Sequence, residues 1–455
     1  MEQAFRTREY HVIAGRDGRP ELLYDLERTQ VFSIAPGNLS DAARAVETSL
    51  IDHEVVTWSP RPPPFVPPTD MAVVDVTLDI VGVCNMGCKY CFEADIGARR
   101  GPMTAQTIDA TIDTVFSKAS AAGLIVQFAS GEALTAFPRL VEAVEKIERR
   151  ARLAGLSLSL ALTTNATLVT PQVAAFLADH AFKVKVSLDG PPEIHNENRP
   201  MLGGQPSYQR VAQGLALLAD RLPKAALTLN TVVRPETSLG DLWDWVRSLP
   251  VGAWVTIPVG EHFGCVSPAQ AERRRRDLER IADEIASAYE AESEILEYEP
   301  LIKVVRKLAM PAPTVRYCGA AEGFIGVRSD GGIYPCLRQL GVEDHRIGDV
   351  WTGLDDSKRR GYLRDFAAPV DRRLSCDSCW ARYLCGGGCY ADSIVYGDDP
   401  SAPLGVHCIF FRLEIETALR LFDRLRASSP LAIVNLFGKE MRATFEDQLA
   451  EFTEE

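Results

Sequence analysis

The sequence has no long apolar run, and no basic start followed by an apolar segment. A membrane-spanning helix needs about 20 consecutive apolar residues, so the first absence argues against one. The second argues against a secretory signal peptide. Positive charge is also scarce, since 49 lysines and arginines face 62 aspartates and glutamates and the net charge is −13. A general nucleic-acid binder needs a basic face for phosphates, so we expect a cytoplasmic protein with no nucleic-acid or membrane partner.

Cysteine, by contrast, is plentiful. The chain of 455 residues contains 11 cysteines and is long enough for two or three domains. Cytoplasmic proteins rarely keep disulfides, so these cysteines are better candidates for metal ligands.

The chain is organised around residues 83–93, which read VCNMGCKYCFE and follow an apolar, strand-like run. Cys84, Cys88 and Cys91 put three thiolates on one tight loop. A [4Fe–4S] cluster takes four thiolates, so three would leave one iron open to another ligand. The alternatives are a zinc site, which usually wants four ligands in paired spacing, and a disulfide, which would leave one cysteine over.

This loop resembles the signature of the radical S-adenosylmethionine (SAM) enzymes, in which the open iron chelates the amino and carboxylate groups of SAM. The resemblance implies a SAM-binding [4Fe–4S] cluster on these three cysteines. It also places Tyr90 beside the adenine, although a packed aromatic side chain is the alternative for this residue.

Residues 71–260 alternate between strand and helix patterns. The expected strands are 73–80, 124–128, 157–163, 183–187, 226–233 and 253–257, and amphipathic helices such as 104–121 and 137–153 lie between them. Six βα repeats predict an α/β fold with a parallel sheet covered by helices. Six is fewer than the eight of a TIM barrel, which agrees with the partial (β/α)6 barrel of the family. Ligands of such sheets gather at the carboxyl ends of the strands, where the three cysteines fall.

The later strands end in residues that resemble the family's SAM pocket. Ser130, Gly131 and Glu132 stand where the family usually has Gly-Gly-Glu, and the resemblance implies that the glutamate accepts from the SAM amino group. Asn165 belongs to Thr-Asn-Ala, where the family usually has Thr-Asn-Gly.

After the fourth strand, Ser187 would reach the SAM ribose and Arg199, further on, would pair with the SAM carboxylate. Singly, such residues are ordinary at strand ends. Their arrival at successive strand ends favours the SAM pocket.

The rest of the chain divides by composition. Residues 1–57 predict a small α+β unit, with strands at 9–13, 21–25 and 30–34 and a helix over 38–50; its order is similar to the winged peptide-recognition module of peptide-modifying relatives, and a packing extension is the alternative. Residues 58–70 are a proline-rich linker.

We expect a bridging helix over 261–310, whose charged run 272–276 is a solvated face. C-terminal helices are expected over 411–455, and Cys265 is expected to be a buried or partly buried thiol.

Residues 311–410 hold seven cysteines in a dense pattern. They resemble the SPASM extension of radical SAM enzymes that modify peptides and proteins, which carries two auxiliary [4Fe–4S] clusters; a zinc knot is the alternative. The resemblance implies two ligand sets, one of four cysteines and one of three: Cys376, Cys379, Cys385 and Cys408, and Cys318, Cys336 and Cys389. The second set then has a non-cysteine ligand or an open iron. Residues 386–388, all glycine, let the backbone pass between the two clusters.

The cysteine loop, the strand-end residues and the cysteine-rich region together resemble the thioether-forming maturases of the sactipeptide and ranthipeptide type. It implies three [4Fe–4S] clusters, SAM, a flavodoxin- or ferredoxin-type reductant and a ribosomally made peptide substrate with a leader segment. The expected product is an intrapeptide thioether crosslink at cysteine. Alternatives are a carbon–carbon or carbon–oxygen crosslink, sulfatase-type cysteine oxidation, and, from another class, an iron–sulfur electron carrier or zinc scaffold. The residues at the strand ends count against a carrier, which needs no SAM pocket.

Overall fold

The computed structural model of the chain describes residues 10–13, 21–25, 30–34, 71–94, 101–258, 266–291, 293–309, 313–428 and 433. Over these ranges no helix combines the length and the apolar character needed to cross a bilayer. The predicted helix at 38–50, the linker at 58–70, Cys265 and most of the chain after 428 lie outside the described residues.

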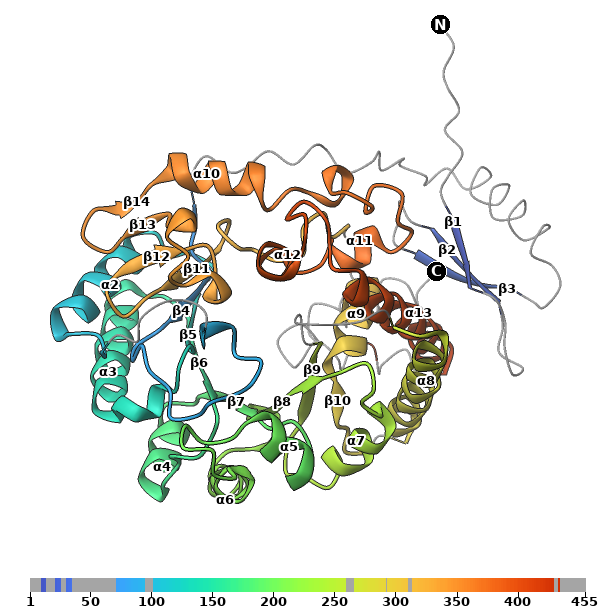
Figure 1. Ribbon diagram of the computed structural model, residues 1–455, viewed down its shortest axis with the longest axis horizontal. Helices are drawn as coiled ribbons and strands as arrows, with labels where there is room; N and C mark the ends of the chain where they lie inside the picture. Colours follow the sequence, from blue (N-terminus) through green and yellow to red (C-terminus); the bar gives the residue numbers. More distant parts are fainter. Residues whose placement is uncertain are drawn as a thin grey trace, which may run out of the picture.

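Six parallel strands form an open barrel, as predicted (Figure 1). They are β4 (Asp75–Leu78), β5 (Leu124–Phe128), β6 (Leu158–Thr164), β7 (Lys183–Ser187), β8 (Leu227–Val233) and β9 (Ala253–Pro258). Each pairs in parallel with the next one along the chain. The predicted α/β fold class with a partial barrel is therefore confirmed. Alternation of side chains places Leu124, Val126 and Phe128 of β5 in the apolar core and Gln127 on the inner face.

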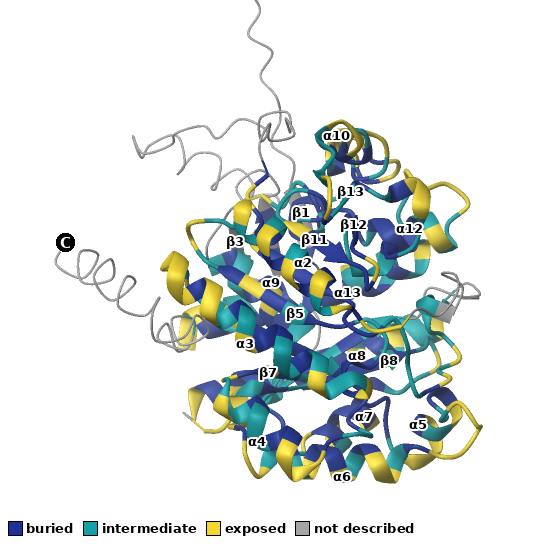
Figure 2. Ribbon diagram, turned by 90° about the vertical axis from the view of Figure 1, so that its left-hand side faces the viewer, coloured by how far each residue is buried: buried dark blue, intermediate teal, exposed yellow. Residues whose placement is uncertain are grey.

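Helices cover the outside of these strands. They are α2 (Ala105–Ser117), α3 (Phe137–Ala154), α4 (Pro171–Asp179), α6 (Tyr208–Ala219) and α7 (Leu239–Val246), while the short α5 (Pro192–Asn198) follows β7. Figure 2 shows buried residues on the inward side of these helices and exposed residues on the outward side, as their amphipathic patterns require. Local signals set their ends: Thr104 caps α2 by accepting from the Thr107 N–H at 3.0 Å, and Gly155 ends α3 in the left-handed region.

The segment predicted as one bridging helix forms two helices instead. These are α8 (Pro268–Glu290) and α9 (Glu299–Ala309), and between them β10 (Glu297–Tyr298) pairs in parallel with β9. Tyr298 is fully buried against Trp254, with ring centroids 5.0 Å apart. This aromatic contact holds β10 against β9 at the edge of the barrel sheet.

The prediction of a solvated face for residues 272–276 is wrong for Arg274. Its side chain is only 5% exposed and ion-pairs with Glu414 at 3.2 Å. Glu414 belongs to α13 (Gly405–Ser428), the long helix that packs on α8 and α9. The charge pattern of α8 could not reveal this contact, because the partner lies 140 residues away.

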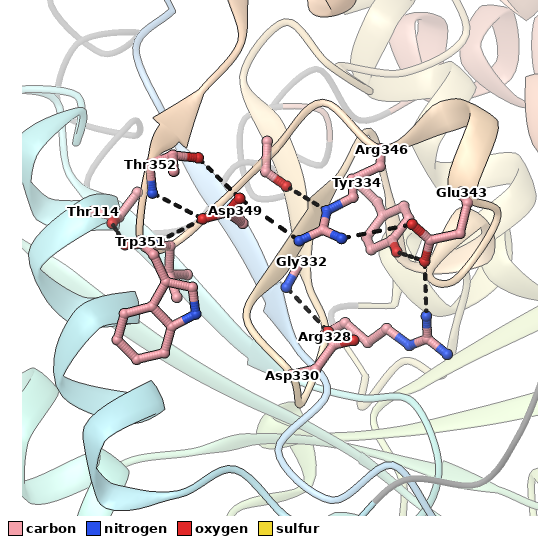
Figure 3. Close-up of polar contacts among 12 residues, drawn as sticks. Thr114, Arg328, Asp330, Gly332, Tyr334, Glu343, Arg346, Asp349, Trp351 and Thr352 are labelled. Carbon is pink, nitrogen blue, oxygen red and sulfur yellow. Dashed lines mark hydrogen bonds and ion pairs between the residues drawn. The ribbon is translucent and has the colours of Figure 1, made fainter.

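The cysteine-rich part continues the barrel sheet. β11 (Phe324–Val327) pairs in parallel with β4, and β12 (Gly332–Tyr334), β13 (Gly348–Asp349) and β14 (Gly353–Leu354) follow in antiparallel order, which gives an 11-stranded sheet. Short polar contacts fix this edge (Figure 3). Asp349 accepts from the Trp351 and Thr352 N–H groups, both at 2.8 Å, and Glu343 accepts from the Tyr334 hydroxyl at 2.8 Å. The predicted boundary at 310 therefore separates segments that share one sheet.

The N-terminal strands form a separate antiparallel sheet, β1 (Tyr10–Ile13), β2 (Glu21–Asp25) and β3 (Gln30–Ile34), close to the predicted positions. The buried ring of Tyr24 meets Trp380, next to Cys379, edge-on with ring centroids 6.3 Å apart. This small sheet thus packs beside the cysteine-rich part. Its role as a peptide-recognition module stays a prediction.

Candidate functional site

A cavity of about 310 Å³ opens at the carboxyl ends of the barrel strands. It brings together seven of the residues singled out in the sequence: Cys88, Tyr90, Cys91, Ser130, Gly131, Ser187 and Arg199. They come from the cysteine loop, from the ends of β5 and β7 and from the end of α5. Cys84, Glu132 and Asn165 are not among its lining residues.

The cysteine loop is held from two sides by hydrogen bonds. On one side Asn165, at the end of β6, donates to the Asn85 side chain at 2.8 Å. On the other side the Gly87 N–H donates to the Pro200 carbonyl at 2.8 Å, after α5. Burial raises the pKa of the Cys84 thiol to about 12. Asn165 therefore braces the loop that carries the thiols.

Tyr90 and Arg199 meet on a buried carboxylate. The Tyr90 hydroxyl donates to Asp189, and Arg199 Nε donates to the same carboxylate at 3.0 Å. The Arg199 guanidinium also lies over the Tyr90 ring, 5.2 Å from its centroid. Asp189 is fully buried, so this arrangement fixes both side chains at the cavity wall.

Glu132 is fully buried and bridges two strand ends. Its carboxylate accepts from the Leu134 N–H at 3.2 Å, the Thr164 hydroxyl at 2.8 Å and the Asn165 N–H at 2.7 Å. Burial raises its pKa to about 7, although these donors act in the opposite direction. A second carboxylate, Glu93, lines the cavity itself and accepts from the Gly131 N–H at 2.7 Å.

Backbone conformation explains the small residues at the strand ends. Gly131 has φ 58°, and a Cβ there would lie 2.2 Å from the Val83 carbonyl oxygen. Ser130 (φ 80°) and Ala166 (φ 58°) are also left-handed. These two non-glycine residues stand where the resembled family usually has glycine, and each carries a strain of roughly 1–2 kcal/mol.

The cysteines of the third part form two groups. Burial raises the pKa of Cys376 to about 12, and the thiols of Cys379, Cys385 and Cys408 raise it further. Burial likewise raises the pKa of Cys336 to about 12, and Cys318 raises it further. The pKa of Cys389 is also raised, mainly by burial and in smaller part by Cys336. Thiols of the same expected ligand set thus act on one another, and the ligand sets themselves stay a prediction.

The glycines 386–388 all have positive φ, as the turn between the two groups requires. A Cβ at Gly386 would lie 2.8 Å from the backbone of Arg316. Only glycine fits there.

The residues present fit iron–sulfur clusters. All ten described cysteines are free thiols, and each of the three groups has an arginine beside it: the buried Arg199 at Cys88, the partly buried Arg338 at Cys336 and Cys389, and the buried Arg373 at Cys376 and Cys408. Arg373 is 1% exposed, and its Nε and Nη1 have no hydrogen-bond partner among the described residues. A cluster bound by thiolates is anionic and would supply the missing countercharge.

A single metal ion fits less well. Across the described ranges, no three His, Cys, Asp or Glu side chains gather closely enough to bind one ion.

The cavity also contains polar residues that the motif analysis did not single out: Glu93, Gln127, Lys185, Asn230 and Arg338. Three of them, Gln127, Lys185 and Asn230, lie on inner positions of β5, β7 and β8. In the sequence, these three residues could be recognised only as polar residues that interrupt apolar strands. This pattern does not identify a site residue, because the sequence does not say which face of the strand points inward.

Residues 78–249 match the family described as the radical SAM superfamily. Residues 78–249 thus form a radical SAM domain. Domains of this family bind a [4Fe–4S] cluster and SAM, so the predicted cofactor class is confirmed; the number of auxiliary clusters stays a prediction.

Related sequences include a cysteine-type anaerobic sulfatase-maturating enzyme of Clostridium perfringens (strain 13 / Type A), which is 30% identical over 139 residues, 30% of this chain and 37% of that enzyme. One from Clostridium novyi (strain NT) is 21% identical over 352 residues, 71% of this chain and 88% of that enzyme. The chain thus aligns with little more than a third of the length of the first of these relatives.

Two solved structures share the fold of the radical SAM domain and its extensions. Native anSMEcpe with bound AdoMet has a TM-score of 0.65 at 19% identity, covering 79% of this chain and 100% of that one. Streptococcus suis SuiB bound to the precursor peptide SuiA has a TM-score of 0.52 at 14% identity, covering 84% and 95%.

Proposed function

We propose that the protein is a radical SAM maturase that modifies a ribosomally made peptide or protein. The observation that carries this proposal is the cavity in which Cys88 and Cys91 meet Ser130, Ser187 and Arg199. The names of the relatives support it, since they are sulfatase-maturating enzymes and a protein solved with its precursor peptide.

In this proposal Cys84, Cys88 and Cys91 hold the cluster. When bound, the cluster and SAM supply the carbon radical that removes a substrate hydrogen. Arg199 and Tyr90, fixed by Asp189, orient the bound SAM, and the buried cavity wall excludes water.

Within this class, we assign an intrapeptide thioether crosslink at cysteine as the product. Cys318, Cys336 and Cys389 form a group of three, and residues 319–335 contain no further cysteine, which leaves room for a substrate thiolate. The bond removes two hydrogens from the peptide, so an electron acceptor nearby is useful. The N-terminal sheet would bind the leader, and a flavodoxin- or ferredoxin-type protein would supply electrons.

The second candidate is sulfatase-type oxidation of one cysteine, which the names of the relatives favour. The two reactions differ in their products. A thioether leaves a peptide that has lost two hydrogens and its free thiol and does not fragment between the joined residues. An oxidised residue leaves fragmentation on both sides intact.

The test uses anaerobically reconstituted protein and a cysteine-bearing peptide encoded beside its coding sequence. We expect roughly twelve iron per chain, SAM cleavage, and a crosslinked product seen by tandem mass spectrometry. Changing Cys84, Cys88 and Cys91 together to Ala should remove about a third of the iron and abolish SAM cleavage. Stoichiometric zinc with little iron would overturn the proposal, and a crosslinked product with an alkylatable thiol would indicate a carbon–carbon or carbon–oxygen bond.

A further inference from the structure

Polar side chains line one wall of the cavity, on the face of the barrel strands opposite to the apolar core. Gln127, Lys185 and Asn230 form this polar wall from β5, β7 and β8, and Asn230 is paired in register with Ser187. Lys185 stands two residues before Ser187, so it lies about 6.6 Å deeper along the strand than the rim where the SAM pocket is expected.

Three cations of the described residues line the cavity, and two of them are neutralised by acidic residues of the chain. Arg199 pairs with the fully buried Asp189 at 3.0 Å, and Arg338 pairs with the buried Asp392. Lys185 forms no ion pair or hydrogen bond with the described part of the chain.

The two acidic residues that act on Lys185 are engaged elsewhere. Asp75 accepts both hydrogen bonds of the Gln127 amide group, at 2.8 and 2.6 Å. Glu299 pairs with Arg306 at 3.2 Å. Burial lowers the pKa of Lys185, as expected for an ammonium without a close counter-ion. A partly buried cation in this state is stabilised by an anionic ligand.

The neighbouring amides define the rest of such a ligand. Asn230 Oδ1 is buried and accepts no hydrogen bond from the described residues. The Gln127 amide nitrogen is held by Asp75, so its oxygen is left to accept. This polar wall therefore offers one cationic hydrogen-bond donor, the Lys185 ammonium, beside two amide oxygens that can accept, those of Gln127 and Asn230. An acidic group flanked by peptide N–H groups matches this set.

We propose that Lys185 binds a carboxylate of the peptide substrate, with a peptide N–H next to it donating to Asn230. The inference rests on the proposed peptide-modifying function and adds a specificity: the modified segment carries an acidic side chain or ends in its terminal carboxylate at this point. Lys185 is then a specificity-determining residue, separate from the groups that hold SAM.

The test measures how fast Lys185 is acetylated by an N-hydroxysuccinimide ester in the reconstituted protein, read by peptide mass spectrometry. Lys183, an exposed lysine on the same strand, is the internal control. N-acetylaspartate methylamide should slow acetylation of Lys185 about fivefold once it exceeds its Kd about fourfold, and leave Lys183 unchanged. N-acetylasparagine methylamide, which differs only in charge, should not protect. N-acetylglycine reports whether a terminal carboxylate serves instead of a side chain.

Calorimetry on variants completes the test. Lys185→Met and Lys185→Gln should weaken binding of the carboxylate that protects by about tenfold or more, as expected for a lost charge-assisted contact. Lys185→Arg and Lys183→Met should retain it. Iron content and SAM affinity should stay unchanged in all four variants.

Equal protection by the asparagine derivative, or no protection by either carboxylate in protein that binds SAM, would overturn the proposal. So would protection by SAM alone together with weaker SAM binding by Lys185→Met, because the carboxylate would then be that of SAM. If the reconstituted protein bound neither iron nor SAM, that result would instead contradict the proposed function. The labelling uses unmutated protein and does not depend on the folding of a variant.

Discussion

At the scale of single residues, the site is set by backbone conformation and by buried carboxylates. Gly131 is required by its φ and by the Val83 carbonyl, whereas Ser130 and Ala166 tolerate the same conformation under strain. Glu132 shows how one side chain can serve two purposes. The sequence suggested a SAM contact, and the structure adds three hydrogen bonds, two of which join the ends of β5 and β6.

We expect Glu132→Ala to destabilise the fold by about 2–4 kcal/mol, because it leaves three buried donors without an acceptor. SAM affinity should fall as well, while the iron content is kept. Urea unfolding and equilibrium SAM binding measure the two effects. Glu145→Ala, at an exposed position on α3, is the control and should change neither. A Glu132 variant with unchanged SAM affinity would move the SAM amino contact elsewhere, for example to Glu93.

At the scale of elements, the pair Arg274–Glu414 joins α8 to α13. Both side chains are more than 90% buried, and Arg274 also lies over the Phe410 ring. The neighbouring pair Arg275–Glu416, at 2.9 Å, is partly exposed. The two pairs lie on the same two helices and differ mainly in their access to water.

Arg274→Met should cost about 3–5 kcal/mol, because it leaves a buried carboxylate without its partner. Arg275→Met should cost at most about 1 kcal/mol. Burial already raises the pKa of Glu414, and loss of Arg274 raises it further. A raised carboxyl pKa favours the protonated form in the folded state, so the penalty of Arg274→Met should be smaller at pH 5 than at pH 8. Equal urea midpoints for the two variants would contradict this account.

At the scale of the whole molecule, one sheet joins the barrel to the cysteine-rich part through β4 and β11. The apolar core continues across this joint. The two regions differ in what balances their buried charges. Among the described residues, two nitrogens of the buried Arg373 have no hydrogen-bond partner, whereas the buried Arg199 in the barrel has its own carboxylate.

Removal of iron should therefore loosen the cysteine-rich part before the barrel. We expect anaerobic chelation to expose residues 370–408 to limited proteolysis, since Arg373 loses its countercharge. The segment 101–258 should stay protected by its apolar core. Mass spectrometry of the fragments locates the cuts. Identical cleavage with and without iron would show that the protein alone stabilises this part.

The positions of the barrel strands and of the cysteine loop could be predicted from the local sequence. The six barrel strands fall within two residues of their predicted ends, because a period of two along β5 or β7 reflects burial of alternate side chains. Cysteine spacing likewise indicated the radical SAM loop, since three thiols within eight residues lie close enough along the chain to share one cluster.

Tertiary structure decided which charges meet. Arg274 reads as a solvated residue until α13 brings Glu414 to it, and Lys185 reads as an ordinary strand residue until its neighbours are found to be engaged elsewhere. The physical reason is that a buried charge is stabilised or left unpaired by groups far away in the chain. Periodicity carries information about which face of an element is buried, but none about which distant side chain lies opposite.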